Sequence, residues 1–322
     1  MEYRTIRDIL TNAEKCFGNE DAIRYKTGKN EIAAKTYTQL KEDSERITAL
    51  LKKLGDPKSH IALIGATSYL WIASYFGIVD GGNVAVPLDM SLPAEELCEL
   101  IDRADVTILI LDESRKDVIE AAKEKCTKLK HIFSMHKEAN EGNILSLTKS
   151  MMEQPIDEDT GAEKTEITPD QLCTIRFTSG TTGKSKGVML THRNLVENAT
   201  CLDMKLPEIN VILSVLPIHH AYCLSMDILK GISLGAIICI NDSLMRVAKN
   251  IKLFKPNMIL MVPLMSETFA NKLEDVKDLP EKVVKEAVFG SQFHTICSGG
   301  AYLNPDYIEL FERFGIQILQ GY

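Results

Sequence analysis

The sequence predicts an α/β fold of doubly wound parallel sheets, and three observations predict it. Short apolar runs alternate with segments of helical period between residues 60 and 134, and the alternation resumes after Asp170. The apolar runs are continuous rather than alternating with polar residues, which is typical of parallel strands buried on both faces. Strands separated by single helices form a parallel sheet with helices on both faces. No internal repeat is visible beyond this alternation.

The first run of elements is delimited by its helix-starting and helix-ending residues. Ser68 is a suitable N-cap, and the glycine pair after Asp80 ends the helix that Ser68 begins. Pro87 is expected to end a strand, and Pro93 fits the first turn of a helix. The predicted elements are the strand His60–Gly65, the helix Ser68–Asp80, the strand Asn83–Val86, the helix Ser91–Ala104, the strand Val106–Leu111, the helix Glu113–Cys126 and the strand His131–Ser134.

The second run of elements follows an acidic segment, residues 153–170, which is poor in apolar residues and contains proline and glycine. We interpret this segment as a solvated connecting loop. Six further strands are predicted after it, with helical segments between them: Leu172–Phe177, Val211–Leu216, Ala236–Ile240, Met258–Val262, Thr295–Cys297 and Ile316–Leu319.

The composition excludes several classes of protein. The 322 residues, 45% hydrophobic and 25% charged, suit about two globular domains. The formal net charge of −8 argues against a protein that binds nucleic acid through a basic surface. The eight cysteines include no C-x-x-C pair, and no apolar segment near the N-terminus suggests a signal peptide. We therefore expect reduced thiols in a cytoplasmic protein. In addition, no stretch of the sequence approaches the ~20 apolar residues of a transmembrane helix.

One loop has the composition of a phosphate-binding site. Thr178–Gly187 reads TSGTTGKSKG and directly follows a predicted strand. Glycines let backbone N–H groups converge, hydroxyl groups add donors, and lysines add positive charge, so the loop suits a polyphosphate. The alternative is a flexible turn that binds nothing. A Walker A loop is disfavoured, because its first glycine would stand at position 178, where this chain has threonine.

The longer segment around this loop, Phe177–Leu195, closely resembles the phosphate-binding signature of the AMP-forming adenylating enzymes. That superfamily comprises acyl-CoA synthetases, luciferases and the adenylation domains of peptide synthetases. One departure is Ser185, where the family commonly has proline. Five weaker resemblances to family motifs occur in the family's order: Thr36–Leu40, Gly81–Asp89, Leu216–Tyr222, Ser298–Ala301 and Leu319–Tyr322.

The resemblance implies the N-terminal domain of an adenylating enzyme, built from two packed doubly wound α/β/α subdomains. Combined with the two runs of elements, it places the first subdomain at residues 58–203, with the phosphate loop at 178–187. Residues 1–57 and 204–322 are then expected to form the second. The chain ends within the last motif, so we expect an N-terminal fragment without the C-terminal domain, without a metal-binding carboxylate and without the parts for full catalysis.

The resemblance also implies roles for individual residues. The β- and γ-phosphates of ATP would contact the loop, and the adenine would lie against the S-G-G-A element and the last tyrosine. His220 aligns with the residue beside the carboxylate being activated, the alternative being a core histidine. The implied set is Thr178, Ser179, Gly180, Thr181, Thr182, Gly183 and Lys186 for the phosphates, and Gly299, Gly300, Ala301 and Tyr322 for adenine.

The acyl pocket is assigned by resemblance and by apolar character, and core packing is an equally suitable role for each of its residues. They are Tyr222, Met226, Val262, Leu264 and Met265. Met261–Leu273 resembles a segment of the fatty acyl-CoA synthetases. An enzyme that activates amino acids is expected to carry an aspartate near Pro217–Tyr222, whereas Asp227 lies further on.

The implied reaction is ATP-dependent activation of a carboxylic acid, with Mg²⁺, to an acyl-adenylate, followed by thioesterification with coenzyme A. The favoured acid is a medium- to long-chain fatty acid. Three alternatives stay open: an aryl or amino-acid ligase of the same superfamily, a ligase that delivers the acyl group to an acyl-carrier protein, and a module that only binds nucleotide or acyl groups.

Overall fold

The computed structural model describes residues 3–55, 57–136, 138, 140–142, 144–156, 165–178, 185–201 and 211–321. The chain divides into two compact units. One comprises Met1–Asn19 with Tyr37–Leu202, and the other Glu20–Thr36 with Asp203–Tyr322. Each unit folds around a seven-stranded sheet of its own, which confirms the predicted α/β class.

The sheet of the first unit has the strand order β7-β6-β5-β3-β4-β8-β9. Every neighbouring pair is parallel except β8 and β9, which form an antiparallel hairpin. The strands are β3 (His60–Ile64), β4 (Val84–Leu88), β5 (Val106–Leu111), β6 (His131–Ser134), β7 (Ile144–Ser146), β8 (Leu172–Thr178) and β9 (Lys186–Thr191).

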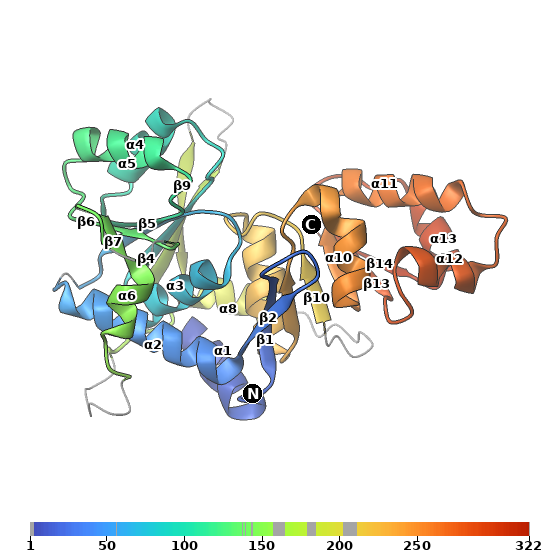
Figure 1. Ribbon diagram of the computed structural model, residues 1–322, viewed down its shortest axis with the longest axis horizontal. Helices are drawn as coiled ribbons and strands as arrows, with labels where there is room; N and C mark the ends of the chain where they lie inside the picture. Colours follow the sequence, from blue (N-terminus) through green and yellow to red (C-terminus); the bar gives the residue numbers. More distant parts are fainter. Residues whose placement is uncertain are drawn as a thin grey trace. The chain divides into compact units, whose positions relative to one another are not determined.

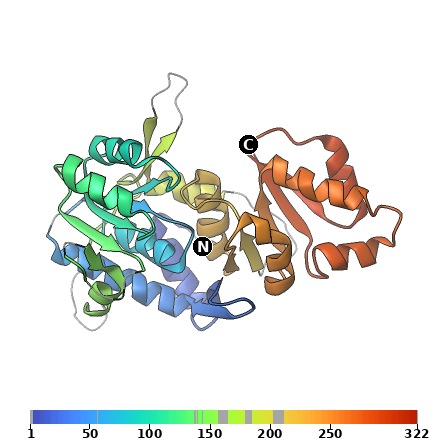
Figure 2. The same cartoon turned by 45° about the horizontal axis from the view of Figure 1, so that its top comes forward.

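Helices cover both faces of this sheet (Figures 1 and 2). The helices α4 and α5 lie on one face, where Leu97, Ile101 and Val118 are buried with strand residues in one apolar core. The helices α1, α2 and α3 gather on the other face. The helices of this unit are α1 (Ile6–Phe17), α2 (Tyr37–Lys53), α3 (Tyr69–Asp80), α4 (Ala94–Arg103), α5 (Lys116–Lys125), α6 (Leu147–Met152) and α8 (His192–Thr200).

The sheet of the second unit has the order β14-β13-β12-β10-β11-β1-β2, and only the β1–β2 pair is antiparallel. Its strands are β1 (Asp21–Lys26), β2 (Ile32–Thr36), β10 (Val211–Ser214), β11 (Ile237–Ile240), β12 (Met258–Met261), β13 (Thr295–Gly299) and β14 (Gln317–Gly321). The helical segments are the π-helix η1 (Cys223–Leu229), α9 (Lys230–Ser233), the 3₁₀-helix η2 (Leu244–Arg246), α10 (Val247–Phe254), α11 (Pro263–Glu274), α12 (Glu281–Val288) and α13 (Pro305–Arg313).

The two sheets share one topology, which no repeat in the sequence indicates. In each sheet the first strand of the βα run lies between the second and the third, and the later strands continue outward beyond the third. In each sheet the opposite edge is an antiparallel hairpin, β8–β9 in the first unit and β1–β2 in the second. The fold is therefore the same doubly wound arrangement used twice.

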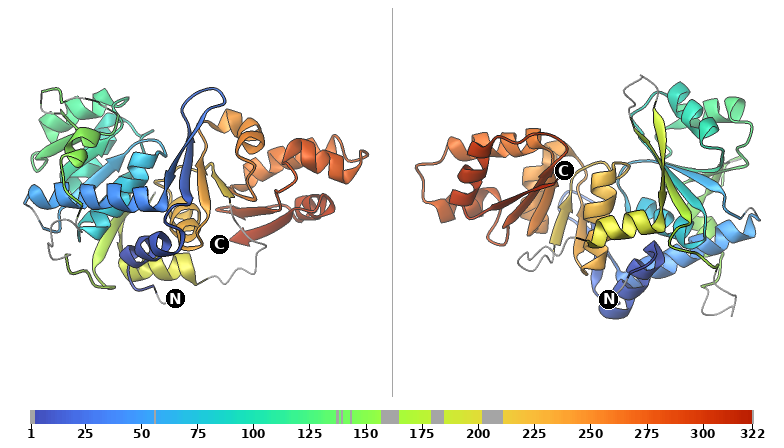
Figure 3. Two further views of the ribbon diagram at one scale, coloured as in Figure 1. Left: turned by 60° about the horizontal axis from the view of Figure 1, so that its bottom comes forward. Right: turned by 180° about the vertical axis from the view of Figure 1, so that it is seen from behind.

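The predicted domain boundaries are wrong for the N-terminal segment. Residues 1–57 were expected in the second subdomain, but only Glu20–Thr36 belongs to that unit, because β1 pairs with β11 as a parallel strand (Figure 3). The helices α1 and α2 belong to the first unit. Of the predicted connecting loop 153–170, residues 157–164 lie outside the described residues.

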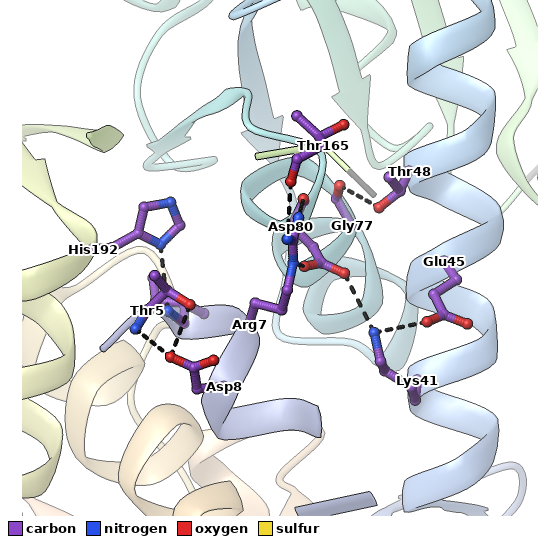
Figure 4. Close-up of polar contacts among 11 residues, drawn as sticks. Thr5, Arg7, Asp8, Lys41, Glu45, Thr48, Gly77, Asp80, Thr165 and His192 are labelled. Carbon is purple, nitrogen blue, oxygen red and sulfur yellow. Dashed lines mark hydrogen bonds and ion pairs between the residues drawn. The ribbon is translucent and has the colours of Figure 1, made fainter. Parts of the chain in front are cut away.

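A buried ionic network explains why α1 and α2 pack in the first unit (Figure 4). The Asp80 carboxylate at the end of α3 pairs with Arg7 from α1 and, at 3.4 Å, with Lys41 from α2. Lys41 also pairs with Glu45 at 2.8 Å. Arg7 donates a further hydrogen bond to the Thr165 carbonyl at 2.9 Å. Three helices are therefore joined at one buried carboxylate, a contact that no periodicity reveals.

Most predicted strands and helices occur within a few residues of their expected bounds, but Pro87 does not end its strand. It lies inside β4, in register with Leu63 of β3. On its other side β4 registers with β8 at Ala85 alone. Proline has no N–H to donate, and β4 has no further registered pair with β8 that would need one.

His192 gives the first unit a predictable dependence on pH. Its ring is fully buried, its Nδ1 accepts the Ile6 N–H at 3.4 Å, and its Nε2 has no partner among the described residues (Figure 4). Burial, with the nearby Arg7, lowers the pKa of His192 from 6.5 to about 4. The unfolded chain therefore binds more protons between pH 4 and 6.5, so the contribution of His192 to stability is present above pH 6.5 and is lost as the pH falls.

We expect the wild type to lose about 2 kcal/mol of unfolding free energy between pH 7 and 5 relative to His192→Asn. Asparagine retains an acceptor near the Nδ1 position but does not titrate. Urea unfolding can be followed by the fluorescence of Trp71, the single tryptophan, which is buried in α3 of the same unit. A wild-type-minus-variant difference that stays constant with pH would contradict this assignment.

Candidate active site

The predicted phosphate loop connects the two strands of the β8–β9 hairpin. Thr178 ends β8, Lys186 begins β9, and the two are a registered antiparallel pair with exposed side chains. The structure therefore places these two predicted phosphate-binding residues side by side, at the carboxyl end of a parallel strand. The other members of the predicted set, Ser179, Gly180, Thr181, Thr182 and Gly183, lie outside the described residues.

The candidate residues of the second unit follow the carboxyl ends of three neighbouring parallel strands. In doubly wound sheets this edge is where ligands bind. His220, Tyr222 and Met226 follow β10, the acyl candidates Val262, Leu264 and Met265 follow β12, and Gly299, Gly300 and Ala301 end or follow β13. Tyr322, the remaining adenine candidate, follows β14 and lies outside the described residues.

Tyr222 lies directly against two glycines of this edge. Gly299 of β13 and Gly321 of β14 form a registered pair. A Cβ added to Gly299 would stand 2.9 Å from the Tyr222 ring and 3.0 Å from the Gly321 carbonyl oxygen, so the ring rests on bare backbone. Burial, followed by the nearby Cys297 and Asp227, raises the pKa of Tyr222. A side chain assigned to the acyl pocket therefore contacts a residue assigned to adenine.

We expect Gly299→Ala to destabilise the second unit by roughly 1–3 kcal/mol, because the added methyl group would stand only 3.0 Å from the Gly321 carbonyl oxygen, which belongs to the backbone. Hydrogen exchange of the amides in β13 and β14 measures this loss. Tyr222→Ala removes the ring side of the clash, so the double variant should cost less than the sum of the two single variants. Strict additivity would show that the close approach of the ring and Gly299 is not what the substitution disturbs.

The remaining candidates of this unit differ in backbone conformation and in exposure. Gly300 adopts a φ of +86°, a backbone conformation that favours glycine. His220 is exposed rather than part of a core, and its ring lies 4.6 Å from that of His219. The acyl candidates combine the half-buried Met226 and Met265 with two exposed aliphatic side chains, Val262 at 36% and Leu264 at 72%.

Asp227 is a buried carboxyl group to which no sequence motif assigns a role. A π-helix has about one residue more per turn than an α-helix, so Asp227 of η1 comes close to both Tyr222 and Cys223. The Cys223 thiol lies 3.8 Å from Oδ2, and Oδ1 has no partner among the described residues. Burial raises the pKa of Asp227 to about 7, although hydrogen bonds from Ser214 and Cys223 oppose the rise. No motif predicts this π-turn.

Neither a metal-binding cluster nor a membrane-spanning helix occurs among the residues that the structure describes. Among them, no group of three or more histidine, cysteine or acidic side chains could hold a metal ion. Within the same ranges, no helix is both long enough and apolar enough to cross a membrane. The eight cysteines are free thiols, of which Cys16 and Cys201 are exposed and the others buried.

Known enzymes are similar to this chain over nearly all of its length. Residues 11–322 match the model of the AMP-binding enzyme family. A long-chain-fatty-acid–CoA ligase of Thermus thermophilus is 25% identical over 98% of this chain and 56% of its own length. A crotonobetaine/carnitine–CoA ligase of Escherichia fergusonii is 24% identical over 98% of this chain and 60% of its own length. The chain thus spans a little over half the length of these relatives.

Solved structures agree in fold. The crystal structure of an anthranilate CoA ligase in complex with anthranoyl-AMP superposes with a TM-score of 0.82 at 21% identity, covering 99% of this chain and 58% of that one. The likeness extends over nearly all of this chain, so both units belong to the shared fold.

Proposed function

The chain belongs to the AMP-binding enzyme family, which its match over residues 11–322 shows, and from that premise we propose that the protein activates a carboxylic acid with ATP and transfers the acyl group to coenzyme A. In the first step a carboxylate oxygen attacks the α-phosphorus of ATP, the bond to pyrophosphate breaks, and an acyl-adenylate forms. In the second step a thiolate attacks the acyl carbon and AMP leaves. Both steps depend on positioning and on stabilisation of phosphate charge, and neither requires a nucleophile from the protein.

One observation carries the proposal: the sequence that resembles a phosphate-binding signature lies in the loop of the β8–β9 hairpin, between the paired residues Thr178 and Lys186. The Lys186 ammonium and the Thr178 hydroxyl both suit β- and γ-phosphate oxygens, as do the hydroxyl and N–H groups of residues 179–183. We propose that adenine lies against Gly299–Ala301 and Tyr322 and that His220 lies beside the carboxylate. Mg²⁺ would enter with the ATP phosphates, and we assign it no protein ligand.

The favoured acid is a medium- to long-chain fatty acid. The Thermus thermophilus relative, a long-chain-fatty-acid–CoA ligase, supports this choice, and so does the apolar character of the acyl candidates. One observation favours a second class of acid. The buried Asp227 carboxyl next to Tyr222 has an oxygen without a partner among the described residues, and it could pair with an amino or hydroxyl group of a polar acid. A crotonobetaine/carnitine–CoA ligase also stands among the relatives.

The acceptor is proposed to be coenzyme A rather than a carrier protein. The named relatives reported above are all CoA ligases. A carrier protein presents the same phosphopantetheine thiol, so the chemistry of the second step is shared and only the acceptor's larger surface differs.

The test is a substrate panel with the whole gene product, MgATP and either coenzyme A or a phosphopantetheine-bearing carrier protein. The acids are straight-chain fatty acids of increasing length, carnitine, anthranilate and amino acids. We expect pyrophosphate and AMP to form only when acid is present, with fatty acids preferred. Release of ADP, or no acid-dependent pyrophosphate with any member of the panel, would refute the proposed activity; preference for a polar acid would select the second class.

A further inference from the structure

Arg103 reaches the phosphate-loop hairpin from a helix far away in the sequence. It lies in the last turn of α4, where a cation is favourable beside the helix carboxyl terminus. Its Nη2 donates a hydrogen bond of 2.7 Å to the carbonyl oxygen of Ser185, 82 residues further along the chain. Its guanidinium also lies over the ring of Phe177, 5.5 Å from the ring centre. One side chain therefore contacts both ends of the loop.

The ring that Arg103 covers is itself anchored. Phe177 packs against the apolar core between the sheet and helices α4 and α5. Its registered partner on β9 is Gly187, and a Cβ added there would lie 3.4 Å from the ring, so the ring extends across a residue without a side chain. The ring thus links the strand that enters the loop to the strand that leaves it, and Arg103 covers this link.

The bond to Ser185 acts on Lys186 through the peptide plane. The Ser185 carbonyl and the Lys186 N–H belong to one planar unit, so a donor on the carbonyl sets the direction in which β9 begins. Serine at this position leaves φ free, where proline would restrict it. Helix position alone does not explain the contact, since Arg103 could satisfy the carboxyl end of α4 and the ion pair with Glu99, at 3.7 Å, without reaching Ser185.

We propose that Arg103 is a positioning residue for ATP: it clamps Phe177 and Ser185 and thereby sets the separation and direction of Thr178 and Lys186, which bind the phosphates. The proposal rests on the proposed function for its ligand, but the clamp itself does not depend on it. If Arg103 clamps the hairpin, the hairpin is ordered without nucleotide. The wild type then binds MgATP more tightly than a variant that lacks the guanidinium, while the KM for the acid is nearly the same in both.

The first measurement is hydrogen exchange at the β8–β9 hairpin in the protein without nucleotide. Loss of one hydrogen bond and one cation–π contact in Arg103→Ala should speed exchange at the amides of β8 and β9 near the loop by roughly 5- to 30-fold. Exchange in β3 and β5 should be unchanged. Arg103→Lys should recover only part of the protection, because an ammonium can donate to the carbonyl but cannot lie flat on the ring.

The second measurement is the Kd for MgATP by calorimetry, together with the split of KM and kcat in the acid-activation assay. Arg103→Ala should raise the Kd and the KM for ATP by roughly 5- to 30-fold and leave the KM for the acid within about 2-fold. The matched control is Glu99→Ala, which removes the ion pair of Arg103 but leaves both contacts with the hairpin. It should behave as the wild type in both measurements.

The outcomes separate the clamp from the function. Unchanged hairpin exchange in Arg103→Ala overturns the clamp. Faster exchange with an unchanged Kd for MgATP overturns the positioning role. If the wild type binds no MgATP, the proposed function fails, while the exchange experiment still decides whether Arg103 holds the hairpin. Equal effects of Glu99→Ala and Arg103→Ala would assign the result to the ion pair and contradict the proposal.

Discussion

Asp80→Asn is expected to lower the unfolding free energy of the first unit by about 3–5 kcal/mol, the range for leaving buried charges without their partner. The substitution keeps the shape of the side chain and removes its charge, so the half-buried Arg7 guanidinium loses its carboxylate partner and the buried Lys41 ammonium keeps only Glu45. Although burial alone would raise the pKa of Asp80, Lys41 and Arg7 outweigh it and hold the pKa below its usual value. Asp80 is therefore the ionised centre of the network.

The measurement is urea unfolding followed by Trp71 fluorescence, since Trp71 lies in the same helix as Asp80. The matched control is Asp170→Asn. Asp170 also pairs with an arginine, Arg193, but its side chain is 75% exposed, and an exposed pair contributes at most about 1 kcal/mol. If the two variants lose similar stability, the network does not hold α1 and α2 to α3.

The fold was largely predictable because its dominant signal is local. A strand such as β5 is a continuous apolar run between turns, and its observed bounds, Val106–Leu111, are those predicted. The cap of α3 was equally local, since Ser68 accepts a hydrogen bond from the Trp71 N–H at 3.2 Å. Signals of this kind need only a few neighbouring residues, so one sequence suffices to read them.

The errors arose where distant segments decide the structure. Nothing near Arg7 or Lys41 indicates that both meet Asp80, and for that reason the N-terminal helices were assigned to the wrong unit. The hairpin β1–β2 is not predicted, because β2 is a short edge strand in which none of the five residues is buried. Edge strands need no apolar run, so periodicity does not reveal them.

The residues of the candidate site also divide into those that a local sequence signal identifies and those that it does not. The loop sequence identified Thr178 and Lys186 by resemblance, and the structure makes them a registered pair. Arg103 and Asp227 could not be found in this way. Arg103 donates a hydrogen bond to Ser185, which is 82 residues away in the sequence, and Asp227 comes close to Tyr222 through a π-turn that no local pattern predicts.

Lys186→Ala should lower kcat/KM by a similar factor with every acid, about 10- to 150-fold, because a charge-assisted phosphate contact contributes roughly 1.5–3 kcal/mol. The phosphates of ATP are the same whichever acid is activated, so the ranking of acids should not change. Lys116→Ala, at an exposed lysine that begins α5 of the same unit, is the matched control and should leave kcat/KM within about 2-fold.

Tyr222→Ala should act differently in the same chain-length series. Each methylene in an apolar pocket changes discrimination by roughly 1–3 kcal/mol, so removing a pocket wall should alter the ranking of acids. Because the Tyr222 ring also rests on Gly299, Tyr222→Ala should raise the KM for ATP as well. Lys186→Ala should raise the same KM, so the KM for ATP does not distinguish the two variants. The ranking is therefore the discriminating quantity. If Lys186→Ala reorders the acids and Tyr222→Ala preserves their order, phosphate binding and acid selection are not divided between these two residues.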